Sequence, residues 1–308
     1  MNKKGVFFTF AAIALSVIII MSFNTYKSYD MKEKTDVVGV RINTVNNFIK
    51  DIEQDLEKGL FIAGFRAFLS MGESIANKGT FITNLEGSFE ELVLQGTLNN
   101  EELSLMKDST FTDWSEKIEA QANKVGITVN FTILSVSITQ EDAWSVLVNA
   151  NLSLEVRDEK NTSSWKRNKS MVAEISTESF EDPLYTLNSQ GRVISAITKS
   201  PITDFTDEGD VSNLLEFINN SYYIESNTSP NFLMRLQGIL SNSSTGIESL
   251  VNLEEFQEQG LAIKDRSAVD YIYFGTQSTS NYRINNTPEW FKLDNGHLEI
   301  YKVQNITI

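Results

Sequence analysis

Few side chains in this 308-residue chain could carry catalytic or metal chemistry. The chain has no cysteine and a single histidine, His297. The lack of cysteine excludes disulfides, thiolate metal sites and a cysteine nucleophile. A zinc site would need mostly carboxylate ligands, which is unusual for zinc. We therefore expect no cofactor and no metal.

His297 follows Asn295-Gly296, a dipeptide typical of a two-residue hairpin turn, and that register places it opposite Asp294. The two side chains could form half of an acid–base site. However, a histidine beside a turn, without a nucleophile motif, is typical of a surface position. No G-x-S-x-G, Walker or H-E-x-x-H motif occurs. We therefore predict that the protein is not an enzyme. The alternative is a hydrolase that uses a pair of carboxylates, since the chain has 41 Asp and Glu residues.

Four acidic side chains gather around a glycine between Asp204 and Asp210. Carboxylates in such a loop are ligands that Ca²⁺ prefers. When Gly209 is aligned with the sixth position of an EF-hand loop, however, Leu215 falls where a bidentate Glu belongs. We therefore expect a solvated loop that caps a helix over Val211–Asn219.

The chain is acidic, with a formal net charge of −15, and residues 59–308 carry the whole negative balance. An acidic body repels nucleic acid. One basic stretch surrounds Trp165 and contains Lys160, Lys166, Arg167 and Lys169. Such a stretch could bind phosphate. The overall charge favours a solvated hairpin tip instead and predicts no nucleic-acid partner.

The N-glycosylation triplet Asn-x-Ser/Thr occurs nine times, and never before residue 130. These possible glycosylation sites are Asn130, Asn151, Asn161, Asn168, Asn219, Asn227, Asn242, Asn285 and Asn305. Their distribution favours an exposed, glycosylated outer body. The alternative is a set of unused triplets in an asparagine-rich chain.

Residues 6–23 form an uncharged, mostly apolar run of 18 residues. As a helix it would rise about 27 Å, just enough to cross a hydrocarbon core. No A-x-A cleavage site follows the run, which predicts a retained transmembrane anchor rather than a secretory signal peptide. The positions of the glycosylation triplets then place the N-terminus in the cytoplasm and the head outside the cell.

The residues around this run carry a family resemblance. Lys3-Lys4-Gly5, directly before Val6-Phe7-Phe8-Thr9-Phe10 and an apolar helix, resembles the class III signal peptide of type IV prepilins. The resemblance implies a leader over residues 1–5, a cut by prepilin peptidase between Gly5 and Val6, and helix packing with other pilin-like subunits. The chain as a whole also resembles archaeal surface proteins with this N-terminus.

The sequence departs from the pilin pattern at one position. Many pilins carry Glu at the fifth mature position, where this chain has Phe10. Phe10 cannot form the salt bridge that the family assigns to that Glu. The resemblance therefore implies a minor or tip component rather than a self-sufficient filament subunit.

The helix is expected to continue as a stalk and core helix over residues 24–79. Apolar residues recur there at spacings of three and four, like the seam of a coiled coil. This seam could face the protein's own head or neighbouring subunits of a homo-oligomer. The expected oligomer contacts are Ile42, Val45, Ile49, Ile52 and Leu56.

Residues 80–200 predict an α+β head. Alternating apolar residues indicate an antiparallel meander over 127–138, 144–156 and 171–175, with a β-bulge near Ile133–Leu134. Residues 201–308 predict a second α+β lobe with a strand at Asp270–Phe274 and a terminal hairpin around Asn295-Gly296. The expected fold is thus α+β, with a long N-terminal transmembrane and stalk helix before a head of antiparallel sheet packed on helices.

Three functions follow from these patterns. The first is a pilin-like, membrane-anchored extracellular protein, structural or adhesive, that serves as a minor or tip component of a type IV pilus-like assembly at the cell surface. The second is an uncleaved, signal-anchored surface binding module such as an adhesin. The third is a membrane-tethered carboxylate hydrolase.

Overall fold

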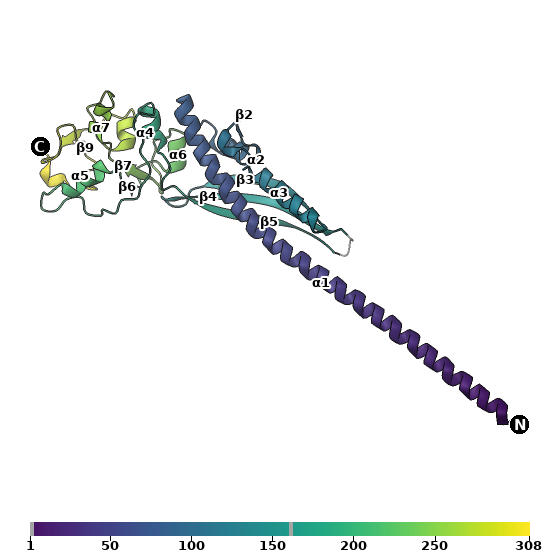
Figure 1. Cartoon of the computed structure of the whole chain (residues 1–308). Coiled ribbons are helices and arrows are strands. Elements are labelled where there is room, and N and C mark those ends of the chain that lie inside the picture. The colour runs from purple at the N-terminus through teal and green to yellow at the C-terminus, as the bar shows by residue number, and fades with distance from the viewer. Residues whose placement is uncertain (1–2, 160–162) are drawn as a thin grey trace. The chain divides into compact units, whose positions relative to one another are not determined.

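A computed structural model describes the backbone of residues 3–159 and 163–308, and the side chains of residues 15–22, 39–159 and 163–308. Its first element is α1, Lys3–Lys78, a single helix of 76 residues (Figure 1). The expected continuous helix over the stalk and core residues is therefore present. It ends at Gly79, whose φ of 66° is a left-handed conformation that suits glycine.

The transmembrane part of the predicted fold is wrong. Within the described residues, no helix combines the length and the apolarity that a membrane crossing requires. The predicted span of 18 residues from Val6 to Phe23 is at the lower limit of length for a crossing, because it rises about 27 Å against a core of about 30 Å.

The chain divides into two compact units, and α1 contributes residues to both. The first unit comprises Met1–Asp55, Ile118–Asn130 and Leu154–Arg167. The second comprises Leu56–Lys117, Phe131–Ser153 and Asn168–Ile308. The lobe boundary expected near residue 200 lies inside the second unit, which also holds the buried polar networks described below.

Helix α1 is a core element of the second unit. Its buried side chains there recur every three or four residues, as expected for one face of a helix. They include Leu56, Leu60, Ala63, Ala67, Phe68, Met71 and Ile75. The ring of Phe68 lies 4.9 Å from that of Phe89, 6.0 Å from that of Phe180 and 5.8 Å from that of Phe232. This aromatic cluster holds three segments, distant in sequence, against α1.

Between α1 and the sheet, the chain forms short elements. They are α2 (Leu85–Gln95), β1 (Thr97–Leu98), β2 (Glu101–Glu102), η1 (Ser104–Met106) and α3 (Phe111–Lys124). Asn84 caps α2 by accepting a hydrogen bond from the backbone N–H of Gly87.

A three-stranded sheet of order β3-β4-β5 follows, formed by Ile127–Thr139, Ser145–Asp158 and Ser164–Ser176. The short connections between these strands require antiparallel pairing. Along β3, burial falls on odd positions up to Val129 and on even positions from Val136, with Leu134 and Ser135 both exposed. The expected change of phase therefore occurs in this part of the strand, and each strand keeps one buried face.

The rest of the chain forms many short elements. Its helices are α4 (Pro183–Asn188), α5 (Ser212–Asn219), α6 (Phe232–Leu236), α7 (Leu253–Glu258), α8 (Asp270–Phe274) and η2 (Gln304–Ile306). Its strands are β6 (Tyr223–Glu225) paired with β7 (Ile247–Ser249), and β8 (Asn281–Arg283) paired with β9 (Lys292–Asp294). Phe217, Tyr301 and Val303 belong to the apolar core that these elements bury.

Two local predictions for this region are wrong. Asp270–Phe274 is the helix α8 and not a strand, because its backbone bonds within itself: the N–H of Tyr273 donates to the carbonyl of Val269 and that of Gly275 to the carbonyl of Tyr271. The terminal hairpin does not form either. Leu293 pairs backward with Tyr282 of β8, and the residues after Asn295 continue as turns that place Leu298 in the core.

Replacement by alanine at two glycines of α1 should change the stability of the fold in opposite directions. A Cβ added at Gly59 would lie 2.4 Å from Cδ1 of Trp114, whereas one added at Gly72 would meet nothing within 4 Å. Gly59→Ala should lower the free energy of unfolding by about 1–3 kcal/mol, because the Trp114 ring must move. Gly72→Ala should raise it by about 1 kcal/mol through helix propensity. Urea unfolding followed by circular dichroism measures both changes, and equal responses would contradict the close contact at Gly59.

Candidate functional site

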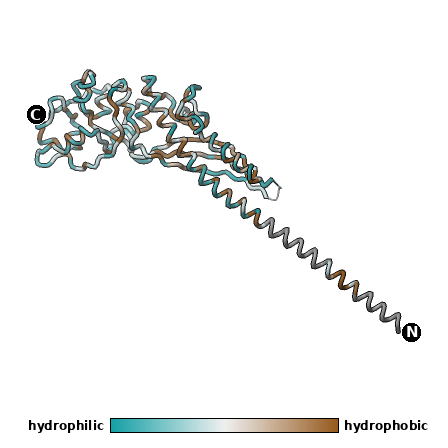
Figure 2. Tube along the Cα trace, viewed as in Figure 1, coloured by the Kyte–Doolittle hydropathy of each residue, from teal (hydrophilic) through white to brown (hydrophobic). Residues whose placement is uncertain are grey.

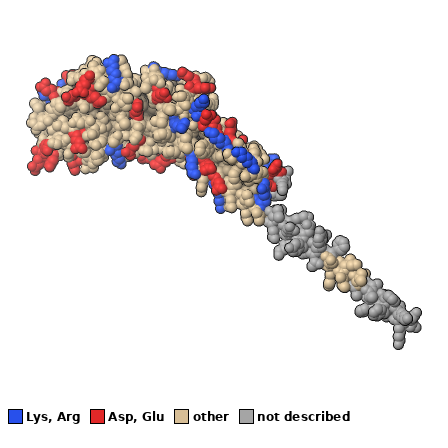
Figure 3. All heavy atoms as spheres, in the orientation of Figure 1, with Lys and Arg blue, Asp and Glu red and all other residues tan. Residues whose placement is uncertain are grey.

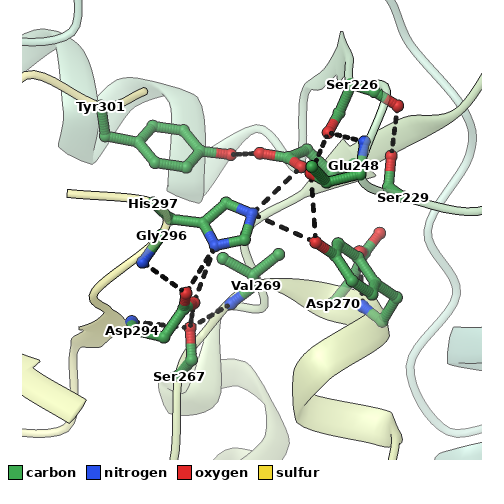
Figure 4. A network of polar contacts seen from close by, with 12 residues as sticks. Ser226, Ser229, Glu248, Ser267, Val269, Asp270, Asp294, Gly296, His297 and Tyr301 are labelled. Atoms are coloured by element: carbon green, nitrogen blue, oxygen red, sulfur yellow. Dashed lines mark hydrogen bonds and ion pairs between the residues drawn. The ribbon is translucent and has the colours of Figure 1, made fainter. Parts of the chain in front are cut away.

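The most elaborate side-chain constellation in the described structure is a buried polar network in the second unit (Figure 4). Glu248 comes from β7, Tyr271 from α8, Asp294 from the end of β9, and His297 from the turns after it. These four side chains belong to residues that are at most 8% exposed. The network therefore lies among the apolar core and not at the surface.

His297 lies between two carboxylates. Its Nδ1 is 2.9 Å from Oδ1 and 2.8 Å from Oδ2 of Asp294, and its Nε2 is 3.3 Å from Oε2 of Glu248. The expected proximity of His297 to Asp294 is therefore present, but the expected surface position is wrong, because the residue is only 4% exposed. The hydroxyl of Tyr301 donates to the other Glu248 oxygen at 3.0 Å and fixes that carboxylate.

These contacts decide the charge of the imidazole. Burial alone lowers the pKa of His297, but hydrogen bonds and charge interactions with Asp294 and Glu248 outweigh it and raise the pKa to about 10. For Asp294, burial raises the pKa, whereas the hydrogen bond to His297 lowers it, and the net pKa is lower than usual. The pair is therefore an imidazolium and a carboxylate at neutral pH.

A second ion cluster adjoins the first, since Ser249 and Asp270 directly neighbour Glu248 and Tyr271 in the chain. Its centre is Arg235, which is 0% exposed. Nη1 of Arg235 donates to Oδ2 of Asp182 at 2.5 Å and to Oδ2 of Asp270 at 2.8 Å. Its Nη2 donates to the carbonyl of Ile247. Burial lowers the pKa of Arg235, but the two carboxylates raise it above its ordinary value, so the guanidinium stays charged.

The surrounding side chains complete the hydrogen bonding of this cluster. Asp182 caps α4 by accepting from the N–H of Leu184 at 2.9 Å, and its other oxygen accepts from the Tyr223 hydroxyl at 2.9 Å. Asp270 accepts from the N–H and the hydroxyl of Ser249. Buried charges of this kind cost stability unless they are paired and fully hydrogen-bonded, as they are here.

The arrangement favours a structural role for both clusters. A general base must release and accept protons near the working pH, and an imidazolium with a pKa of about 10 does not. The guanidinium and its two carboxylates are fully covered. No group of His, Asp and Glu among the described residues has the arrangement of a metal site. We interpret the networks as internal ion pairs that hold the fold.

The acidic loop and the basic stretch have surface contacts of their own. Asp204 pairs with Lys302, and Oδ1 of Asp210 accepts from the N–H of Ser212 at 2.9 Å at the start of α5. This is the capping role that was expected of the loop. In the basic stretch, the Arg167 guanidinium lies 4.7 Å from the centre of the Trp165 ring, and Lys166 pairs with Glu155 at 3.7 Å. Lys160 lies outside the described residues.

The possible glycosylation sites lie at the surface. Every one of the eight that the structure describes is exposed, namely Asn130, Asn151, Asn168, Asn219, Asn227, Asn242, Asn285 and Asn305. Asn161 lies outside the described residues. Asn151 differs from the others because its amide donates to the Ser135 hydroxyl at 3.0 Å and accepts from that of Ser170 at 2.5 Å. Whether these sites carry glycans stays a prediction.

The expected oligomer contacts are mostly covered by the chain itself. Val45, Ile49, Ile52 and Leu56 are between 0% and 6% exposed, and only Ile42 of the expected set is exposed, at 39%. Buried side chains cannot contact a neighbouring subunit, so the seam serves the fold of the single chain. For the processing residues, Gly5 and Val6, the structure describes only the backbone.

Sequence reasoning missed the residues at the centre of the networks. Arg235 stands in the apolar stretch Phe232–Leu236, and Glu248 stands between Ile247 and a run of buried residues. A lone charge inside an apolar stretch of this kind signals a buried ion pair. Its partners, Asp182 and Asp270, are 53 and 35 residues from Arg235, a separation that no local pattern reveals.

Comparison with known proteins identified no similar protein. No family model matches the chain, and neither does any curated protein or solved structure.

Removal of the buried guanidinium should strongly destabilise the fold. Arg235→Met leaves Asp182 and Asp270 buried without a counter-charge, and we expect the free energy of unfolding to fall by about 3–5 kcal/mol. Arg192→Met, at an exposed arginine, is the matched control and should change it by about 0.5 kcal/mol or less. Urea unfolding of both variants tests the expectation. Similar stability of the two would show that Arg235 does not hold the cluster.

The single histidine makes the charge of the network directly measurable. Its folded pKa of about 10 exceeds its ordinary value of 6.5, so its stabilising effect is complete below about pH 6.5 and is lost as the pH rises through about 10. NMR titration of the imidazole should give a midpoint near pH 10. Stability should also fall more steeply from pH 7 to pH 10.5 in the native chain than in a His297→Gln variant. A midpoint near 6.5 would contradict the ion pairing.

Proposed function

We propose that this chain is a pilin-like structural subunit of a cell-surface assembly, which displays its α+β head outside the cell. The observation that carries the proposal is α1 itself. One helix of 76 residues serves as a core element of the head and also continues far toward the N-terminus, into an apolar stretch. Prepilin-like residues, Lys3-Lys4-Gly5 before Val6, stand directly before that stretch.

The N-terminal part of α1 has side chains that suit assembly. Residues 15–22 form a mostly hydrophobic stretch of α1 (Figure 2), and six of their large apolar side chains are 46–67% exposed. They are Leu15, Val17, Ile18, Ile19, Ile20 and Met21. An exposed apolar surface of this kind marks an interaction site. Contacts with other pilin-like subunits would remove it from water.

The head has the surface expected of a displayed body. Figure 3 shows acidic side chains spread over the visible face, in keeping with the net charge of −15. Such a charge favours solubility and repels nucleic acid. The eight exposed glycosylation triplets support the same placement outside the cell.

Phe10 supports a minor or tip role within the assembly. An apolar ring at this position provides no charge for a salt bridge with a neighbour's N-terminal amine, so lateral association rests on apolar contacts alone. We therefore propose that the protein joins an assembly built with other pilin-like subunits. The residues of both buried ion networks are at most 8% exposed, which leaves a substrate little access to them, and we propose a structural rather than an enzymatic role.

Intact-mass analysis and N-terminal sequencing of the protein from the surface of producing cells test this function. We expect a mature chain that starts at Val6 and retains α1, because prepilin-type processing removes only the leader. A Gly5→Leu variant should keep residues 1–5. A native chain that keeps Met1 or Asn2 as its only terminus would contradict the processing, and a terminus beyond Phe23 would contradict the assembly role of the helix.

A further inference from the structure

The second unit has an apolar groove along α1. Its volume is about 460 Å³, within the range of roughly 300–1,000 Å³ typical of binding pockets. Leu69, Gly72 and Ala76 form one wall and lie on the same face of α1. Leu105, Phe180 and Leu236 lie across from them among the lining residues. The lining carries two charged side chains, Glu73 and Glu181, and both are acidic.

The groove continues into an exposed apolar stripe on the same helix. Phe61, Phe65 and Leu69 are spaced four residues apart and are 43%, 38% and 37% exposed. The rings of Phe61 and Phe65 are stacked, with centroids 6.2 Å apart, and the Phe65 ring lies 5.2 Å from that of Phe180. Leu105, in the lining, is also 37% exposed. A folded chain seldom leaves several large apolar side chains in contact with water in one place unless a partner covers them.

At Gly72 the groove has free space. A Cβ added there meets no atom within 4 Å, although Gly72 is an interior residue of a helix, where glycine costs stability. Gly72 has no side chain and Ala76 only a methyl group, so this wall of the groove is low. A second helix could therefore approach α1 closely, because the distance between packed helices depends on the side chains at the contact.

We propose that this groove binds residues 15–22 of α1 from a second copy of the chain. The proposal rests on the proposed assembly function and specifies a contact that would join two copies of this chain within the assembly. Residues 15–22 form a helical segment with six exposed large apolar side chains, which matches the apolar lining. Both the segment and the groove are exposed in the single chain, so the contact joins two copies.

Charge complementarity favours the same occupant. The first acidic residue of the chain is Asp30, and the processed chain before it carries the amino group of Val6 and Lys27. The apolar segment is thus flanked by positive charges only. The charged side chains of the groove, Glu73 and Glu181, are negative. Opposite charges around an apolar contact favour the correct partner and orientation.

This contact joins two different surfaces, so each copy would offer one segment and one groove. A heterologous contact of this kind extends into an open assembly unless its rotation closes a ring. In an assembly built with other pilin-like subunits, the contact would join only those copies of this chain that meet there.

Cysteine cross-linking of the full chain tests the contact, because the native chain has no cysteine. We would mix an Ala76→Cys protein with an Ile18→Cys or an Ile20→Cys protein, which place the thiol at two points around the segment. The expected result is a disulfide-linked dimer of the mixed pair, at least tenfold above an Asn242→Cys control. Asn242 is exposed and is not part of the groove lining. Yields no higher than in the control for both segment positions would overturn the proposal.

A matched pair of glycine variants supplies the second test. Gly72→Leu fills the groove, whereas Gly39→Leu makes the same change elsewhere on α1, and a Cβ meets nothing within 4 Å at either site. Both proteins should remain folded by circular dichroism. We expect Gly72→Leu to reduce cross-linking at least tenfold and Gly39→Leu to leave it unchanged. Equal cross-linking in the two would also overturn the proposal.

Electron microscopy of cell-surface assemblies separates the two proposals. If the native chain enters assemblies but the cysteine variants do not cross-link through the groove, the groove contact is wrong and the structural function stands. If the native chain does not enter assemblies and the cysteine variants do not cross-link, both are wrong. If cross-linking occurs as expected and Gly72→Leu also prevents incorporation into assemblies, both are supported.

Discussion

The buried guanidinium of Arg235 is the constraint on which the fold of residues 182–270 depends. It bonds the start of α4 through Asp182, the strand β7 through the Ile247 carbonyl, and the start of α8 through Asp270. None of these short elements would be stable alone, since helices of five or six residues are marginal in water. Because the buried guanidinium must bond all of these partners at once, it couples the folding of α4, β7 and α8.

The secondary structure of the first 180 residues was largely predictable because it depends on periodicity. Alternation defined the strands and the change of phase between Ile133 and Val136, and spacings of three and four defined α1. Periodicity shows that a face is buried but not what buries it. Ile49 and Leu56 fit a subunit interface as well as an intramolecular core, and the structure places both in the interior of one chain.

Residues 201–308 were less predictable because long-range contacts override local signals there. Asn295-Gly296 is a strong hairpin signal, yet β9 already pairs with β8, and the following residues turn to bring His297 between Asp294 and Glu248. The apolar, aromatic sequence of α8 is typical of a strand. In the folded chain, however, Asp270 accepts hydrogen bonds from Arg235 and Ser249, two contacts that no local pattern predicts. The candidate networks escaped prediction for the same reason, since their members meet only in the folded chain.

The buried imidazolium has a consequence for how copies of this protein could meet. Histidine is the side chain that ordinarily changes charge near neutral pH, and the only one here is held protonated in the interior. The surface charge therefore comes almost entirely from Asp, Glu, Lys and Arg, which keep their charges across the neutral range. Repulsion between acidic heads would then weaken as ionic strength rises, because salt shortens the screening length. Mild acidification of the surroundings would hardly change it.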